Sequence, residues 1–341
     1  MVLMRLFTSL ACALTACALL AFPARLKAAE VTHARLSVVF HTDIGTDIDD
    51  TWALAQILRS RDLDLKYVLT DTGDTRTRAA LVAKFLEATG RTDIPIGIGV
   101  PGPTGDQPLN LEPWLKGYDL AKYPGRIDAD GVAGLIRCIE QSTAPVTVIS
   151  TSAVPSLAAA LARAPDLPKK CRFVGMFGSI DHGYGDNSPP VAEWNVKVAP
   201  AALRLVLAAP WRDVLITPLD TCGNVSIAGS DYRAIWSSTA DPILRSLVEG
   251  YCIFAPRVTW MHCDFFTTRS TTLFDCVAVY LASSEALVEV ESLRLRIADD
   301  GSTLRDPQGL PVRVALRWKD RAAFEHQLAR LLLPPDDGPV K

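Results

Sequence analysis

The sequence contains no C-x-x-C pair, and this absence argues against a zinc site. Two of its eight cysteines, Cys12 and Cys17, fall within the first 29 residues. Several of the other six stand in apolar surroundings typical of buried free thiols, although an exported chain could oxidise some of them. The sequence leaves the state of these six thiols open.

The chain also lacks an excess of positive charge. The chain has 35 Lys and Arg against 38 Asp and Glu, a formal net charge of −3, and three of the basic residues lie in the first 29. No basic patch suggests a nucleic acid or an acidic membrane surface as a partner. We therefore expect no nucleic-acid partner.

Long apolar runs are confined to the N-terminus. Arg5 precedes an apolar run over residues 6–22, and Ala28 and Ala29 are the small residues expected before a signal-peptidase cleavage site. The run is short for a membrane span, and no later run is long enough either. We expect residues 1–29 to be a signal peptide and the chain to be exported, periplasmic or secreted, without a stable membrane span. Lipoprotein processing at Cys17 is the alternative.

The rest of the chain has no linker or internal repeat that would divide it, so residues 30–341 are expected to form a single domain. Strand-like and helix-like segments alternate, which predicts an α/β fold with an open, mostly parallel sheet and helices on both faces. Predicted strands are 63–69, 94–100, 146–150, 173–177 and 214–217, and predicted helices are 78–89, 132–141, 155–163 and 200–208. At the C-terminus we expect a hairpin of 288–297 with 312–316, followed by a helix over 321–332.

The stretch from residue 38 to residue 54 concentrates the chemistry. A buried strand is predicted at its start and a helix from Trp52, and four aspartates lie between them: Asp43, Asp47, Asp49 and Asp50. Two carboxylates about 4 Å apart repel by roughly 4 kcal/mol at an effective dielectric near 20. The helix N-terminus could compensate Asp49 and Asp50, whereas a calcium or magnesium ion could compensate all four. We favour a metal site, with helix capping as the alternative.

This stretch also resembles a known family. The run HTDIGTDIDDTWA, which starts at His41, is similar to the D-T-D-x-G-x-D-D-A-L-A signature of the inosine–uridine-type nucleoside hydrolases, which holds a calcium ion. Two residues are added here before the Asp-Asp pair, and His41 replaces the first aspartate. The resemblance implies a nucleoside-hydrolase-like fold with bound Ca²⁺.

A second run, GDNSPPVAEWN, resembles the family's G-N-x-x-P-x-A-E-[FW]-N segment. The spacing from Asn187 to Glu193 and Asn195 is intact, whereas Asp186 replaces a glycine. Amides and a carboxylate suit the hydroxyls of a sugar, and Trp194 offers an apolar wall. The alternative is a polar loop with local hydrogen bonds.

Three single residues also match the family. Thr151 falls on a threonine whose backbone carbonyl ligates calcium, although it could merely end a strand. Asp275 resembles the aspartate that completes the calcium shell, a role compatible with capping the helix that follows. Asp74 occupies the place of an asparagine that contacts ribose, or else belongs to an ordinary turn.

The resemblance extends from about residue 37 to residue 332 and implies an enzyme that hydrolyses the N-glycosidic bond of ribonucleosides to ribose and free base. The implied ligands of Ca²⁺ are Asp43, Asp50, Asp275 and the Thr151 carbonyl. The implied ribose-binding residues are Asp49, Asp74, Asn187, Glu193, Trp194 and Asn195. Asp43 would also act as general base toward the attacking water. Whether Asp47 joins the metal shell stays open.

One position departs from the chemistry of the family. Many members carry a histidine before the last aspartate as general acid for the leaving base, and here that residue is Phe274. A displaced acid or stacking of the base on an aromatic ring could replace it. The candidates are His182 and His262 for the acid, and Trp194, Trp260 and Phe274 for the stack. Because solvent can protonate purines at N7, we predict that purine ribonucleosides are preferred over pyrimidine ones.

Two rival functions remain. The run from Asp47 to Thr51 fits the D-x-D-x-T motif of haloacid-dehalogenase-like phosphatases, but its nucleophile should stand at a strand end, and Asp47 lies seven residues past Phe40. The other rival is an exported nucleoside- or sugar-binding protein of the same fold without turnover. The sequence leaves open the nucleobase and the oligomeric state, with a homo-oligomer among the options.

Overall fold

The computed structural model describes residues 34–102, 108–186, 188–260 and 264–334. The described residues from Ala34 onward form one compact unit by their contacts. The signal peptide expected over residues 1–29 lies outside the described residues, as do Asn187 and His262.

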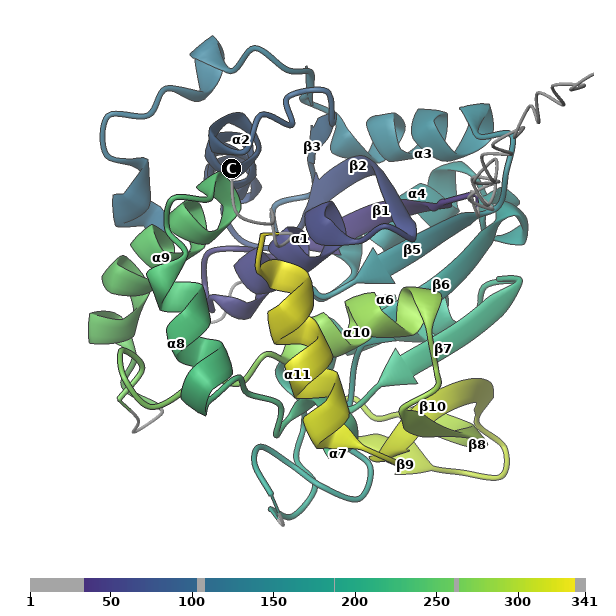
Figure 1. Ribbon diagram of the computed structural model, residues 1–341. Coiled ribbons are helices and arrows are strands. Elements are labelled where there is room, and N and C mark those ends of the chain that lie inside the picture. Colours follow the sequence, from purple (N-terminus) through teal and green to yellow (C-terminus); the bar gives the residue numbers. More distant parts are fainter. Residues whose placement is uncertain (1–33, 103–107, 187, 261–263, 335–341) are drawn as a thin grey trace, which may run out of the picture. The chain divides into compact units, whose positions relative to one another are not determined.

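One sheet of ten strands runs through the described part of the chain, in the order β4-β3-β2-β1-β5-β6-β7-β10-β8-β9 (Figure 1). The strands are β1 Leu36–Thr42, β2 Leu63–Thr70, β3 Ile96–Ile98, β4 Ile127–Asp128, β5 Val146–Ser150, β6 Cys171–Met176, β7 Asp213–Thr217, β8 Val288–Ile297, β9 Thr303–Arg305 and β10 Leu310–Trp318. All neighbours from β4 to β10 pair in parallel, and β8 pairs antiparallel with β10 and β9. The predicted open, mostly parallel sheet is confirmed.

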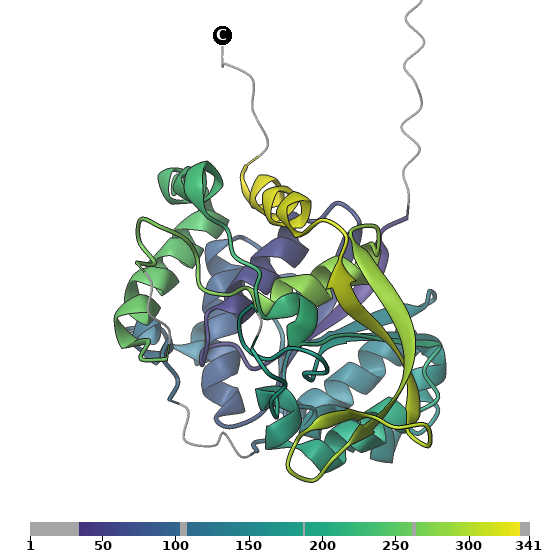
Figure 2. The same cartoon turned by 90° about the horizontal axis from the view of Figure 1, so that it is seen from below.

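Helices cover both faces of this sheet (Figures 1 and 2). The α-helices are α1 Asp49–Arg59, α2 Thr75–Ala88, α3 Gly131–Gln141, α4 Pro155–Arg163, α5 Trp194–Val198, α6 Pro200–Ala208, α7 Leu219–Cys222, α8 Gly229–Ser237, α9 Pro242–Phe254, α10 Phe274–Ser283 and α11 Arg321–Leu332. Helices α1, α2, α9, α10 and α11 share one apolar core, and α3, α4 and α6 share the other.

The central strand β1 shows why the sheet is buried on both sides. Val38 and Phe40 belong to the core on one face, and Val39 belongs to the core on the other face. Each is fully buried. Parallel strands that carry helices on both faces need such a continuous apolar run, because alternate side chains point to opposite faces.

The order of the strands places a binding crevice at β1 and β5. From β1 the chain moves outward through β2, β3 and β4, and it returns with β5 on the other side of β1. In open α/β sheets, ligands bind beyond the carboxyl ends of the strands at such a switch point. β1 ends at Thr42 and β5 ends at Ser150. Asp43 and Thr151 are therefore the first residues at this point.

Several elements differ from the sequence-based expectation. Helix α1 begins at Asp49 rather than at Trp52, so that two of the four aspartates lie in its first turn. The C-terminal hairpin is present, but its connection contains β9, and β10 also joins β7 in parallel. Helices α8 and α9 were not predicted.

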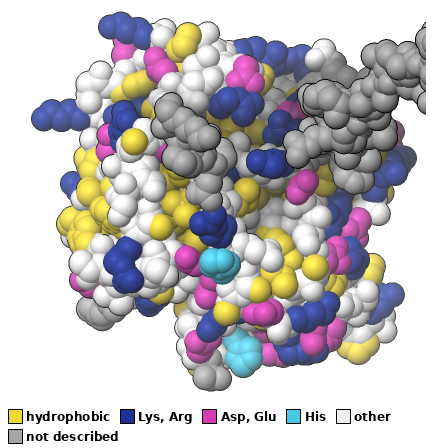
Figure 3. Space-filling view, in the orientation of Figure 1, with side chains coloured by type: hydrophobic (Ala, Val, Ile, Leu, Met, Phe, Trp, Pro, Cys, Tyr) yellow, Lys and Arg dark blue, Asp and Glu magenta, His cyan; other side chains and the backbone are white. Residues whose placement is uncertain are grey.

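The described surface and cysteines add two facts. Lys and Arg side chains are interspersed with Asp and Glu on the face drawn in Figure 3. The five cysteines in the described ranges are free thiols, and Cys171, Cys222 and Cys276 are buried. Within the same ranges, no helix has the length and apolar character needed to cross a membrane.

Candidate active site

The loop between β1 and α1 is fixed by a glycine in a conformation that other residues rarely adopt. Gly45 has a φ of +114°, and a Cβ atom there would lie 2.5 Å from Cδ1 of Leu81. Its carbonyl accepts a hydrogen bond from the backbone N–H of Leu111 at 3.0 Å. Asn110 Nδ2 donates to the carbonyl of Thr46 at 2.8 Å. This anchored turn delivers Asp49 and Asp50 at the N-terminus of α1.

Three carboxylates from two distant segments meet beyond the sheet edge. Asp49, Asp50 and Asp275 each offer an oxygen atom, and these atoms lie within 4.8 Å of one another. Their exposed fractions are 4%, 3% and 3%. The backbone N–H of Asp275 points to Oδ2 of Asp49 at 3.4 Å. Oδ1 of Asp50 accepts hydrogen bonds from the hydroxyls of Thr42 and Thr151, at 2.5 and 2.9 Å.

These buried carboxylates are electrostatically uncompensated. In the described part of the chain, none of the three forms an ion pair with Lys, Arg or His. Burial, and then mutual repulsion, raises the pKa of Asp49 and of Asp275 well above the ordinary value. Burial and the charge of Asp43 raise the pKa of Asp50 to about 8. An all-oxygen donor set with surplus negative charge suits Ca²⁺ or Mg²⁺, so the residues present fit the expected metal.

Asp43 stands at the end of β1 and remains partly open to solvent. It is not one of the three residues whose oxygen atoms meet. Burial raises its pKa, while the positive charge of Arg78 acts in the opposite direction. Arg78 donates to the carbonyls of Asp43, Ile44 and Thr72 and not to a carboxylate of the cluster. Burial likewise raises the pKa of Asp47 to about 6.

Thr151 and Asn195 meet although 44 residues separate them. Asn195 Nδ2 donates to the Thr151 carbonyl and to the Met176 carbonyl, each at 3.2 Å. Asn195 is 6% exposed. The carbonyl expected to ligate the metal therefore lies beside the amide expected to bind the sugar, and both adjoin Asp50 through the Thr151 hydroxyl.

Glu193 caps helix α5. Its carboxylate accepts from the backbone N–H groups of Gly178, Asn195 and Val196, at 3.0, 2.7 and 3.2 Å. The side chain is 1% exposed, and burial raises its pKa to about 7. The sequence pattern A-E-W-N thus encodes a helix cap that fixes the position of Asn195.

Other expected site residues lie at the margin. Asp74 is exposed and caps α2, accepting from the backbone N–H and hydroxyl of Thr77 at 3.0 and 2.7 Å, as in the ordinary-turn alternative. Trp194 is partly buried, whereas Trp260 is 47% exposed and packs against Phe254. His182 is exposed, and its hydrogen bonds within the described residues run through its backbone.

The histidine that replaces the first aspartate of the signature has a buried partner. His41 Nε2 lies 2.8 Å from Oδ2 of Asp71, and its Nδ1 lies 2.8 Å from the Ser150 hydroxyl. Asp71 also accepts from the backbone N–H groups of Thr72 and Ser156, at 2.8 and 2.7 Å. Sequence reasoning missed Asp71, because the pair joins residues 30 positions apart. The pair ties the ends of β1 and β5 to the segment that follows β2.

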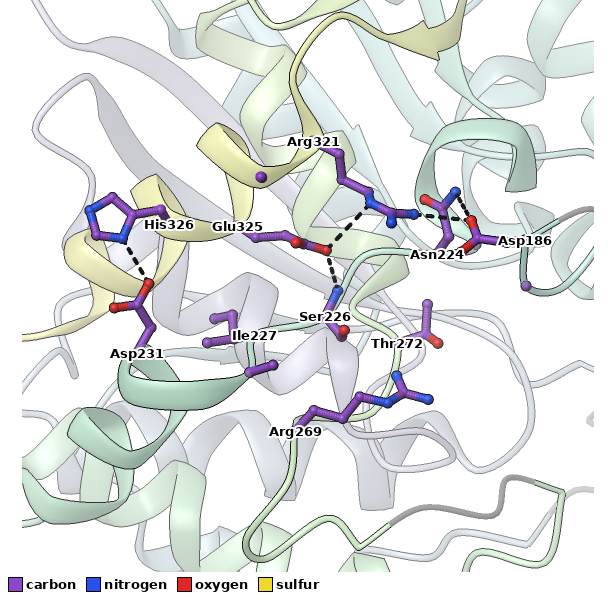
Figure 4. A pocket seen from close by; sticks show the side chains of 14 residues that line it. Asp186, Asn224, Ser226, Ile227, Asp231, Arg269, Thr272, Arg321, Glu325 and His326 are labelled. Carbon is purple, nitrogen blue, oxygen red and sulfur yellow. Dashed lines mark hydrogen bonds and ion pairs between the residues drawn. The ribbon is translucent and has the colours of Figure 1, made fainter.

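A separate cavity of about 460 Å³ is lined by residues of the loop that precedes α5 and by residues of α11 (Figure 4). None of the aspartates of the cluster lines it. At its wall Asp186 accepts from Arg321 Nη1 at 3.0 Å and from Asn224 Nδ2 at 2.8 Å. Glu325 accepts from the backbone N–H of Ser226 at 2.9 Å. Asp186, which stands where the family has glycine, thus anchors this loop to α11.

Comparison with known proteins agrees with this geometry. The family model described as inosine-uridine preferring nucleoside hydrolase matches residues 38–326. The pyrimidine-specific ribonucleoside hydrolase RihA of Enterobacter sp. (strain 638) is 30% identical over 233 residues, which cover 62% of this chain and 70% of the relative.

Solved structures share the fold. A plant nucleoside hydrolase, PpNRh1, superposes with a TM-score of 0.73 at 21% identity, covering 89% of this chain and 100% of the other. The inosine-uridine preferring nucleoside hydrolase from Bacillus anthracis gives a TM-score of 0.68 at 20% identity, covering 87% and 99%. The family match spans both the aspartate cluster and the Glu193–Asn195 cap. The chain is therefore a member of the inosine-uridine preferring nucleoside hydrolase family.

Proposed function

We propose that this protein is a calcium-dependent hydrolase that cleaves the N-glycosidic bond of ribonucleosides to give ribose and free base. The observation that carries the proposal is the uncompensated carboxylate cluster of Asp49, Asp50 and Asp275 at the switch point of the sheet. Membership of the family supports the reaction type. It excludes the phosphatase alternative, whose nucleophile at Asp47 would also stand well past the end of β1.

The residues that would hold the ion are Asp50 and Asp275 of the cluster, together with Asp43, whose charge acts on both of them, and the carbonyl of Thr151. When bound, calcium would supply positive charge that polarises water and attracts the ribose diol. The raised pKa values of the cluster support this assignment, because a bound cation would stabilise the charged carboxylates that burial and mutual repulsion disfavour.

Asp43 would take a proton from the water that attacks C1′. Its partial exposure leaves room for that water, and its raised pKa brings it nearer to neutrality, where a general base is most effective. The C1′–N bond breaks through an oxocarbenium-like state. The residues that would orient the ribose hydroxyls are Asp49, Asn187, Glu193 and Asn195, with Trp194 as an apolar wall and Asp74 at the margin.

The test is product analysis with the purified chain after chelation and resupply of Ca²⁺. We expect free ribose and free base in equal amounts from at least one common ribonucleoside, and neither product in excess chelator. Turnover unaffected by chelation would refute the calcium dependence. Binding of Ca²⁺ and nucleoside without any product would support a binding protein of the same fold instead.

Base preference is a separate part of the proposal. We expect purine ribonucleosides to be better substrates than pyrimidine ones, because solvent can protonate purines at N7 and Phe274, directly before Asp275, offers aromatic surface for stacking. The Enterobacter relative is named as a pyrimidine-specific enzyme. Values of kcat/KM for inosine and uridine decide the question, and equal values would rule out the purine preference.

We also propose that the enzyme acts outside the cytoplasm. Residues 1–29 have the order of a secretory signal, with Arg5, an apolar run and small residues at the end. Mass spectrometry of the exported protein should find a mature N-terminus near Ala29 or Glu30. A lipid on Cys17 would establish the lipoprotein alternative, and an intact Met1 in the cytoplasm would exclude both.

A further inference from the structure

Tyr184 contacts two segments near the carboxylate cluster, the start of α5 and the start of α10. Its ring meets the Phe274 ring edge to face, with centroids 5.9 Å apart, and Phe274 directly precedes Asp275. Its hydroxyl oxygen accepts a hydrogen bond from the backbone N–H of Trp194 at 3.2 Å. The charges of Glu193 and Asp47 both act on the phenol. Tyr184 therefore borders the site from the side of α5 and α10.

The loop that carries Tyr184 is held at several points. The Tyr184 carbonyl accepts from the Ser188 hydroxyl at 2.7 Å. The backbone N–H of Gly185 donates to the Gly223 carbonyl at 3.2 Å, and Gly185 has a φ of +84°. The ion pair of Asp186 with Arg321 fixes the next residue to α11, as Figure 4 shows. These backbone contacts, together with the ring contact to Phe274, hold the tyrosine in place.

The Tyr184 hydroxyl has a hydrogen atom to give. Its oxygen serves as an acceptor for Trp194, and within the described ranges the hydroxyl donates to no other group. The side chain is 47% exposed. Desolvation and the negative charge of Glu193 raise the pKa of the phenol above its ordinary value, so the hydroxyl keeps its proton at neutral pH. It is a hydrogen-bond donor and a weak acid.

Cleavage of an N-glycosidic bond creates a need for such a donor. The electron pair of the C1′–N bond goes to the base, which leaves with negative charge. A fixed donor aimed at developing charge is worth about 10²–10³ in kcat. Phe274 has no hydrogen-bond donor in its side chain, and Trp194 has only its indole N–H. Tyr184 contacts both residues and carries a hydroxyl group.

We propose that Tyr184 is a catalytic residue whose hydroxyl donates a hydrogen bond to the leaving nucleobase. The phenol keeps its proton, and the departing base takes its proton from water, so that charge and protons balance. This role rests on the proposed function, and it adds a residue that sequence patterns do not mark.

The test is the variant Tyr184→Phe, assayed on inosine and on 4-nitrophenyl β-D-riboside. The nitrophenolate leaves without help, whereas hypoxanthine does not. We expect kcat for inosine to fall about 10²-fold, while kcat for the nitrophenyl riboside stays near that of the wild type. Tyr118→Phe is the matched control, because it removes a hydroxyl bonded to the exposed Glu87, and both rates should be unchanged.

Other outcomes overturn the inference. Equal losses on both substrates would mean that Tyr184 only maintains structure, and an unchanged rate on inosine would mean that it donates nothing. Calorimetric Ca²⁺ binding should match the wild type, which separates the role of Tyr184 from damage to the cluster. A wild-type protein that releases neither hypoxanthine nor nitrophenolate would refute the proposed function, and this inference with it.

Discussion

Two groups of acidic residues in this protein differ in how their negative charge is compensated. At the β7–β10 side, Asp213 accepts from Arg172 and from Arg313, each at 2.9 Å. Glu285 accepts from the same two arginines at 3.1 and 2.5 Å. Two carboxylates and two guanidinium groups thus form a closed set of ion pairs. Their side chains are between 24% and 36% exposed.

The cluster at the carboxyl end of β1 is deeper and has no such partners. Asp49, Asp50 and Asp275 are each less than 5% exposed, and Arg78, whose charge acts on Asp50, donates its hydrogen bonds to carbonyls and a hydroxyl. Burying charge without a partner is far more costly than leaving it half exposed. The surplus at the cluster is the charge that the proposed ion would neutralise, whereas the arginine set neutralises its own carboxylates.

The largest effect is expected when one carboxylate is removed from the cluster. We expect Asp50→Ala to abolish tight Ca²⁺ binding and nucleoside turnover. Changing a residue that only supports a metal ligand typically costs roughly 10–100-fold in metal affinity or activity. Removing a ligand itself should cost more. Elemental analysis and calorimetry of the purified variant measure Ca²⁺ binding. Equal calcium content in wild type and variant would refute the metal assignment.

Asp43→Asn tests the division of labour within the site. The amide keeps the shape of the side chain but accepts no proton, so kcat should fall about 10²–10⁴-fold. Turnover of the preferred nucleoside at saturating Ca²⁺ gives the value. A kcat close to that of the wild type would assign the general base to another residue.

The stability of the metal-free protein should depend on pH in the direction set by the raised pKa values. Asp50 has a pKa of about 8 in the folded chain, against 3.8 ordinarily, so the folded state binds more protons between these values. Stability therefore falls as pH rises from about 4 to 8, by up to about 1.4 kcal/mol per pH unit for one such group.

Calcium should reverse this trend, because the ion competes with protons for the same oxygen atoms. Melting curves with chelator and with Ca²⁺ should therefore diverge more at pH 8 than at pH 5. Asp50→Asn should flatten the chelator curve. A Ca²⁺-induced shift that is the same at both pH values would contradict the picture of uncompensated carboxylates.

The smallest effect is expected at the arginine set. Asp213→Asn leaves Arg172 and Arg313 with weaker partners, at a cost of about 1 kcal/mol in the free energy of unfolding. Ca²⁺ affinity and kcat should stay at wild-type values, as measured by denaturant titration, calorimetry and turnover. A large loss of activity would show that the two groups of charges are coupled.

Much of the fold was readable from the sequence where apolar periodicity is strong. The boundaries of β5 and α4 were predicted to the residue, because a buried strand rich in β-branched residues is followed by a helix that Pro155 starts. Three-residue β9 and four-residue α7 are too short to give a periodic signal. Helix α9 has an Asp241 cap and Pro242 at its first position, a local signal that sequence reasoning did not use.

The site was predictable only in part, since its contacts are not local. Crowded aspartates before α1 marked the cluster, and Asp275 was found through the family pattern. The partnership of His41 with Asp71, and the place of Tyr184 against Phe274, depend on strand order and on a folded loop. No spacing within one segment encodes such contacts. Glu193 was predicted to bind the sugar, and the structure shows that it caps α5; its contact with the sugar stays a prediction.

The most direct test of the central claim is to titrate Ca²⁺ into chelator-treated protein while following release of base from inosine. Hydrolysis should be absent at the start and should recover in full as one equivalent of Ca²⁺ is bound. Asp213→Asn should follow the wild-type curve, and Asp50→Ala should not recover. Full activity of protein shown by elemental analysis to contain no metal would contradict the account.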